Sequence, residues 1–175
     1  MSEKSVFEGK IFSVSIRTMM DEGHEIRRDI VRHPGGVALC CVMDHKILLV
    51  RQPRAAVEQE TLEIPAGTRE PGESPELTGM RELNEEAGLA CDSLRLITSF
   101  WPTPGYDTET IWVYEAVGLR PVENRRPMDP DEHISDLWID LNDAYRMIQD
   151  GTIRDGKTII AIQHVLLNEK AGCQA

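Results

Sequence analysis

The chain has 175 residues, of which 41% are hydrophobic and 28% charged, a composition typical of one globular domain rather than of a disordered protein. Its net charge of −11 argues against nucleic acid or an anionic membrane as the main partner, because both attract basic surfaces. No apolar stretch approaches the roughly 18 residues that cross a bilayer. The first residues, MSEKSVFEGK, lack the apolar region of a signal peptide, so we expect a cytoplasmic protein.

Residues 1–35 predict an antiparallel strand unit. Phe12, Val14 and Ile16 alternate with polar residues, as in a half-buried strand, and residues 26–31 return as a second strand after a turn at 21–24. A lone hairpin is marginally stable in water. We therefore expect residues 1–35 to form an arm that packs on a neighbour, and residues 36–175 to form the main domain.

Two apolar runs, 37–42 and 46–51, predict neighbouring strands, and residues 61–65 predict a short extended segment. The four cysteines, of which Cys40 and Cys41 lie in the first run, show no CxxC spacing. Reduced thiols in the core are therefore a better interpretation than a disulfide or a zinc site.

Residues 74–87 predict a helix, because Ser74 is a good N-cap, Pro75 suits the first helical position and Gly88 suits the C-cap. At about 100° per residue, one broad face of this helix carries its apolar side chains, which are Leu77, Met80, Leu83 and Ala87. The opposite, narrow sector carries three glutamates, which are Glu82, Glu85 and Glu86.

The remaining elements predict a fold with strands in front and helices behind. Strands are expected at 94–100, 110–117 and 137–140, and helices at 142–150 and 157–169. This order favours an α+β or mixed-sheet sandwich. Residues 120–135 are rich in proline and acidic residues, which predicts a long loop of the kind that often carries function.

The three glutamates repel one another on the bare helix, and two interpretations address that repulsion. The first is a solvated face, which explains the acidity but not the clustering. The second is a site for a hard cation such as Mg²⁺, which prefers oxygen ligands and is often held by one or two carboxylates, waters and substrate phosphates. Such an ion would polarise a phosphoryl group and help to deprotonate a water.

The segment GTREPGESPELTGMRELNEEAGL at 67–89 resembles the Nudix box, and every defined position of that pattern is met. The matching residues are Gly67, Glu73, Arg81, Glu82, Leu83, Glu85, Glu86, Gly88 and Leu89. The resemblance implies an α/β/α sandwich with a mixed sheet, and hydrolysis of a nucleoside diphosphate linked to another group with Mg²⁺ or Mn²⁺. By the same resemblance Glu82 and Glu86 would be the principal metal ligands, with Glu85 close by and the Ala66 carbonyl as a further ligand. Arg81 would orient the carboxylates, and Glu73 would support the loop.

Residues outside the box resemble the ADP-ribose pyrophosphatase branch of this family. Pro104 lies fifteen residues beyond Leu89 and is followed by Gly105, as in that branch, although an ordinary turn has the same composition. Within 51–67, Arg54 is a candidate for a substrate phosphate, with a surface charge as the alternative, and Glu63 is a candidate for a polar contact to substrate or site. The resemblance favours ADP-ribose as substrate over another nucleoside diphosphate sugar such as GDP-mannose, or a non-hydrolytic nucleotide-binding role.

The resemblance also implies two features away from the box. An acidic loop would bring Glu132 near the metals, with its neighbour Asp131 and a plain solvated loop as the alternatives. The arm would exchange between subunits of a homodimer. This exchange would place Arg28, and less firmly Phe12, beside the adenine of the substrate that is bound to the partner subunit.

Overall fold

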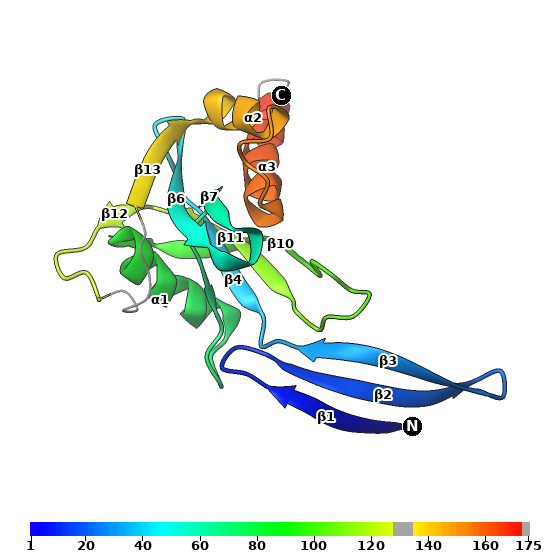
Figure 1. Cartoon of the computed structure of the whole chain (residues 1–175). Helices are drawn as coiled ribbons and strands as arrows, with labels where there is room; N and C mark the ends of the chain where they lie inside the picture. Colours follow the sequence, from blue (N-terminus) through cyan, green and yellow to red (C-terminus); the bar gives the residue numbers. More distant parts are fainter. Residues whose placement is uncertain (128–134, 173–175) are drawn as a thin grey trace.

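The computed structural model describes residues 1–127 and 135–172, and Figure 1 shows their arrangement. In chain order the elements are β1 (Ser2–Glu8), β2 (Ser13–Asp21), β3 (His24–Arg32), β4 (Gly36–Cys40), β5 (Val42–Met43), β6 (Lys46–Arg54), a 3₁₀ turn η1 (Ala55–Val57), β7 (Gln59–Glu63), β8 (Ala66–Thr68), α1 (Pro75–Ala87), β9 (Leu89–Ala90), β10 (Ser93–Phe100), β11 (Ile111–Val117), β12 (Arg120–Pro121), β13 (Ser135–Asp140), α2 (Leu141–Gln149) and α3 (Gly156–Gly172).

The body of the molecule places sheets between helices. One sheet has the order β10-β11-β4-β8, in which β11 and β4 run parallel and the other pairs antiparallel, and a second has the order β13-β6-β5 with β7 on β6. Figure 1 shows α1 on one side of these strands and α2 with α3 on the other. The predicted α/β/α sandwich with a mixed sheet is confirmed.

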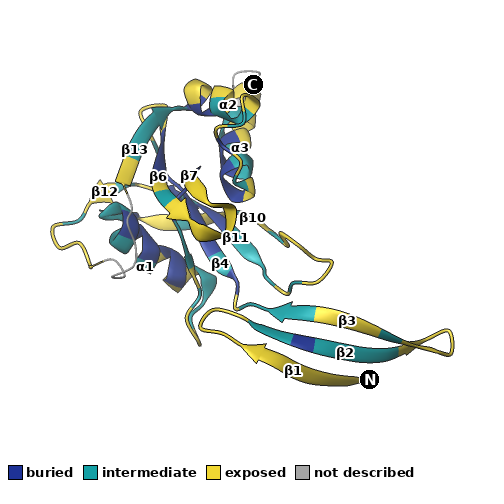
Figure 2. Cartoon of the chain, viewed as in Figure 1, coloured by how far each residue is buried: buried dark blue, intermediate teal, exposed yellow. Residues whose placement is uncertain are grey.

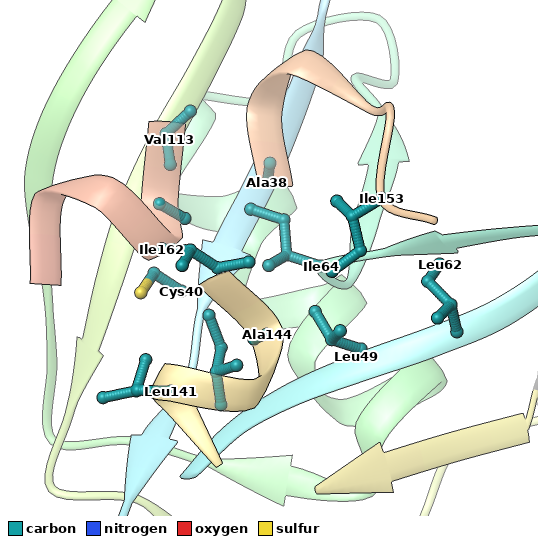
Figure 3. Packing of buried hydrophobic residues seen from close by; sticks show 12 residues of the cluster. Ala38, Cys40, Leu49, Leu62, Ile64, Val113, Leu141, Ala144, Ile153 and Ile162 are labelled. Carbon is teal, nitrogen blue, oxygen red and sulfur yellow. The ribbon is translucent and has the colours of Figure 1, made fainter. Parts of the chain in front are cut away.

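Strand β4 explains why the apolar run at 37–42 is nearly continuous. Its alternate side chains enter two different cores, because Ala38 and Cys40 face one cluster while Val37 and Leu39 face the other. Figure 3 shows the first cluster, where Leu49 of β6 and Ile64, which directly follows β7, meet residues of α2 and α3. Helix α1 covers the second cluster through Leu83, which is 0% exposed.

The cysteines of the described chain are core residues, as predicted. Cys40, Cys41 and Cys91 are free and buried. Burial raises the pKa of Cys40 to about 12, which keeps that thiol protonated and unreactive at neutral pH. Among residues 1–127 and 135–172 no helix is long and apolar enough to cross a membrane.

The amino-terminal arm has three strands where the sequence predicted two. Strands β1, β2 and β3 form an antiparallel sheet that projects from the body, and most of it is exposed (Figure 2). Strand β1 has no apolar alternation that would reveal it. Its Glu3 instead accepts hydrogen bonds from Ser15 and Arg17 on β2 and from Arg32 on β3, and polar pairing of this kind leaves no periodic signal.

The apolar face predicted for the helix at 74–87 is wrong in part. Leu77 is 62% exposed and Met80 is 40% exposed, whereas Glu82 and Glu86 are buried, with only 6% and 1% of their surface exposed. The reason is Gly79, where an added Cβ would come within 2.9 Å of Leu94 and 3.3 Å of Val37. Because Gly79 carries no side chain, α1 lies close to the sheet on that side and turns its acidic sector inward.

Candidate active site

Helix α1 begins and ends as the sequence predicts. The Ser74 side chain accepts from the Leu77 amide at 3.3 Å, Pro75 occupies the first turn, and Gly88 adopts a left-handed conformation at φ 61°. These caps fix the helix register. In this register Glu82 and Glu86, one turn apart, both lie against strand β8.

Arg81 connects the carboxylates of the box. Its Nη1 donates to Glu82 Oε1 at 2.5 Å and to Glu85 Oε2 at 3.0 Å, and its Nη2 donates to Glu73 Oε2 at 3.1 Å. Hydrogen bonds from Arg81 and Thr78 lower the pKa of Glu73 to about 2, so this carboxylate is ionised at neutral pH. Arg126 Nη1 also lies 3.9 Å from Glu85 Oε1, so two guanidinium groups face three carboxylates and negative charge remains in excess.

Strand β8 approaches the two buried glutamates through its backbone. The Ala66 amide donates to Glu86 Oε2 at 2.8 Å. At Gly67 an added Cβ would lie 1.8 Å from Glu82 Oε1, so only glycine leaves this carboxylate its place. The glycine at this position thus leaves space that the Glu82 carboxylate occupies.

Arg54 and Glu63 form a second ion cluster. Arg54 Nε and Nη2 donate to the two oxygens of Glu63 at 2.8 and 2.7 Å. Glu63 also accepts from Thr61 Oγ1 at 2.6 Å and from Lys157 Nζ at 2.5 Å. Burial raises the pKa of Glu63, but Arg54 and Lys157 outweigh it and lower that pKa to about 2. With both oxygens occupied, Glu63 orients Arg54 rather than presenting a vacant acceptor.

A cavity of about 570 Å³ lies between these clusters. Among its lining residues are five of the predicted site residues, which are Arg54, Ala66, Arg81, Glu82 and Glu86. Lys10 and Ile11, from the turn between β1 and β2, line the same cavity, so the arm reaches the site of its own chain.

Other predicted site residues lie elsewhere. Pro104 and Gly105 are exposed in the loop between β10 and β11, and Arg28 is exposed on strand β3 of the arm. None of these three lines the cavity. Glu132 and Asp131 lie outside the described residues.

Sequence reasoning missed two cations of this region. Arg69 stacks its guanidinium over Trp112, 4.9 Å from the ring centroid, while Nη2 donates to the Glu73 carbonyl at 2.7 Å. Lys157 is only 9% exposed although it lies in the first turn of α3, where the helix dipole disfavours a cation. That unfavourable position was the sequence signal that could have directed attention to a buried carboxylate partner.

The oxygen donors fit a magnesium-like ion. In the described ranges, no group of three or more His, Cys, Asp or Glu side chains is arranged to hold a metal unaided. Mg²⁺ does not need such a cage, because it commonly uses one or two carboxylates together with waters and substrate phosphates. Glu82 and Glu86 line the cavity from the acidic cluster and supply donors of this type.

Comparison with known proteins agrees with this geometry. The family model described as "NUDIX domain" matches residues 32–161. The chain belongs to the Nudix family. The match includes the whole segment 67–89 that carries Glu82 and Glu86, and the chain is a Nudix pyrophosphatase.

Several curated Nudix relatives align over almost the whole chain. An ADP-ribose pyrophosphatase of Bacillus subtilis (strain 168) is 36% identical over 99% of this chain and 95% of its own length. A methanol dehydrogenase activator of Bacillus methanolicus is 37% identical over 95% of this chain and 91% of its own. A crystal structure of an ADP compounds hydrolase superposes with a TM-score of 0.83 at 20% identity, covering 100% of this chain and 95% of that one, which shows the shared fold.

Proposed function

We propose that this protein hydrolyses the diphosphate of ADP-ribose to AMP and ribose 5-phosphate, with Mg²⁺ as the activating ion and Mn²⁺ as a substitute. The observation that carries the proposal is the cavity that joins the buried Glu82 and Glu86 to Arg54. The relatives that bear the name ADP-ribose pyrophosphatase support the choice of substrate.

The residues that line the cavity would have separate roles in metal binding and in substrate binding. Glu82 and Glu86, with Glu85 and the Ala66 carbonyl nearby, would hold the metal, which when bound neutralises phosphate charge and makes a water more acidic. Arg81 keeps the carboxylates in place. Arg54 offers a planar set of N–H donors to a phosphate oxygen. The proposal also keeps three substrate contacts that do not line the cavity. Pro104 and Gly105 would reach the substrate by a shift of their loop or from a second subunit, and Arg28 would reach it from a second subunit.

Glu132 completes the proposal as the residue that positions or deprotonates the attacking water. It lies outside the described residues, so this role rests on the family resemblance alone. Glu132→Gln should lower kcat much more than it raises KM, while Asp131→Asn should do little. The role passes to Asp131 if only Asp131→Asn is slow, and to Glu85 if both variants keep wild-type kcat.

We also propose a homodimer in which the arm, residues 1–35, packs on the partner's catalytic domain, residues 36–175. The arm exposes several large apolar side chains, which are Val6, Phe7, Ile11, Phe12 and Met20. Grouped apolar exposure of this kind usually marks an interface. Sedimentation at assay concentrations should give a dimer, and a monomer with normal activity would contradict the proposal. The buried free thiols are in keeping with a cytoplasmic location.

The test of the substrate is a depletion assay with Mg²⁺ and a panel of nucleoside diphosphate sugars that includes ADP-ribose and GDP-mannose. We expect ADP-ribose to be consumed with the highest kcat/KM and AMP and ribose 5-phosphate to accumulate together. Faster consumption of GDP-mannose would move the assignment within the family. The relative named methanol dehydrogenase activator favours a second role, action on a partner enzyme, and binding of ADP-ribose without any turnover would support that role instead.

A further inference from the structure

We propose that Lys157 is a positioning residue for substrate binding, which acts through Glu63 to hold the Arg54 guanidinium at the cavity. The inference rests on the proposed function, because it takes the bound group to be a diphosphate. Lys157 belongs to α3, far in sequence from the box, and does not line the cavity itself.

The contacts of Lys157 define a chain of ion pairs that ends at the cavity. Its Nζ lies 2.5 Å from Glu63 Oε2 and 2.8 Å from Asp155 Oδ1. Glu63 in turn binds Arg54 in a two-point pair, and Arg54 lines the cavity. The side chains of Lys157 and Glu63 are 11% and 4% exposed, whereas that of Arg54 is 44% exposed. The buried end of this series of ion pairs is therefore held in place, and its more exposed end, Arg54, faces the cavity.

The helix that carries Lys157 is itself tied to strand β7. Asp155, directly before α3, caps the start of the helix: its Oδ2 accepts from both the amide and the hydroxyl of Thr158. Thr158 Oγ1 also accepts from the Ile64 amide at 2.8 Å, directly after Glu63. Lys157 thus enters the cluster from a backbone whose position relative to Glu63 is set by hydrogen bonds.

The charges of the cluster explain why the lysine matters for an anionic substrate. Arg54 and Lys157 balance Glu63 and Asp155. Without Lys157 the cluster would carry one net negative charge, and Arg54 would be the one cation left to face Glu63 and Asp155, so its guanidinium would be less available to a diphosphate. Glu63 would also lose the second cation that keeps its carboxylate in the orientation that Arg54 needs. Among residues 1–127 and 135–172 Arg54 pairs through Nε and Nη2, which leaves its Nη1 group for a phosphate oxygen.

The test is a double-mutant cycle between Lys157→Met and Arg54→Ala. We expect Lys157→Met to raise KM for ADP-ribose about tenfold or more, with a smaller change in kcat, since it weakens a charge-assisted contact in binding. In the Arg54→Ala background the same lysine change should have little further effect, because Lys157 acts through Arg54. Lys170→Met removes the same charge from the exposed end of α3 and should leave KM unchanged.

The outcomes separate this inference from the proposed function. If the wild type consumes ADP-ribose but Lys157→Met keeps the wild-type KM, or if its effect adds fully to that of Arg54→Ala, the inference is overturned and the function stands. If the wild type consumes no ADP-ribose, the proposed function fails. The same double-mutant cycle is then measured by calorimetry as changes in the Kd for ADP. Non-additive changes in Kd support the inference, and additive changes overturn it. Should Lys157→Met lose its thermal transition, Lys157→Gln, which keeps a donor, takes its place in the cycle.

Discussion

Two ion clusters flank one cavity, and they differ in charge balance. In the Nudix cluster, defined by Glu73, Arg81, Glu82, Glu85 and Glu86, four carboxylates meet two guanidinium groups, that of Arg81 and, 3.9 Å from Glu85, that of Arg126. In the Arg54 cluster, defined by Arg54, Glu63, Asp155 and Lys157, two cations meet two carboxylates. A set of carboxylates with excess negative charge can accept an added cation, whereas a balanced set gains little from one. The comparison therefore supports the proposal that the first cluster binds the metal and the second orients Arg54.

The largest expected effect comes from neutralising a carboxylate of the Nudix site. Glu86→Gln keeps the size of the side chain and an oxygen that can accept the Ala66 amide, so the fold should persist while turnover falls at least about a hundredfold. Glu82→Gln should behave in the same way. Glu60→Gln, an exposed change of equal charge outside the cavity, is the control. Wild-type turnover in both box variants would show that these glutamates have no part in the chemistry.

Leu83→Ala sharpens the comparison from the same helix. Leu83 is 0% exposed and packs in the second core, so its loss should cost roughly 2–5 kcal/mol of unfolding free energy. Turnover per folded molecule should stay near the wild-type value. Denaturant unfolding and an assay below the transition measure the two quantities separately, and a loss of turnover without a loss of stability would contradict the assignment.

Gly67→Ala tests the fit between strand β8 and the buried carboxylate. Its Cβ would displace the Glu82 side chain rather than the backbone, since the atoms it would meet are all in that carboxylate. We expect activity to fall about tenfold or more with a small change in melting temperature. The exposed Gly156, where a Cβ meets nothing within 4 Å and which does not line the cavity, supplies the matched control Gly156→Ala for backbone effects. Equal activity of the two variants would mean that the position of Glu82 is unimportant.

The smallest expected effect is the pH dependence of the Arg54 cluster. Glu63 has its pKa lowered from 4.5 to about 2, so its contribution to stability is present above pH 4.5 and is lost as the pH falls toward 2. Glu63→Gln should therefore be less stable than the wild type at pH 7, by roughly 1–3 kcal/mol. The two proteins should converge as the pH falls through this window. Thermal unfolding measured from pH 7 to pH 3 checks this, and a constant difference would contradict it.

The sequence predicted those parts of the fold that depend on local rules. The caps at Ser74 and Gly88 gave the limits of α1, and the apolar runs gave β4 and β6. The inward face of α1 was not predictable from hydrophobicity, because the close approach at Gly79 depends on Val37 and Leu94. A helical wheel cannot show such contacts between distant residues.

The candidate site was predictable to a similar degree. The box pattern identified Glu82 and Glu86, and the structure brings both to the cavity with Arg54. The box pattern could not identify Lys157, because its partner Glu63 lies 94 positions away along the chain. Strand β1 was missed for a related reason, since Glu3 pairs with Arg32 across the arm and leaves no periodic trace in the sequence.

The measurement that tests the central claim most directly is the release of AMP from ADP-ribose by the wild type before and after chelation. If the unbalanced carboxylates of the Nudix cluster form the metal site, activity should disappear with excess chelator and return when Mg²⁺ is restored. In parallel, added Mg²⁺ should raise the melting temperature of the wild type by mass action, and Glu82→Gln should show a smaller rise. Full activity after exhaustive chelation would contradict the account.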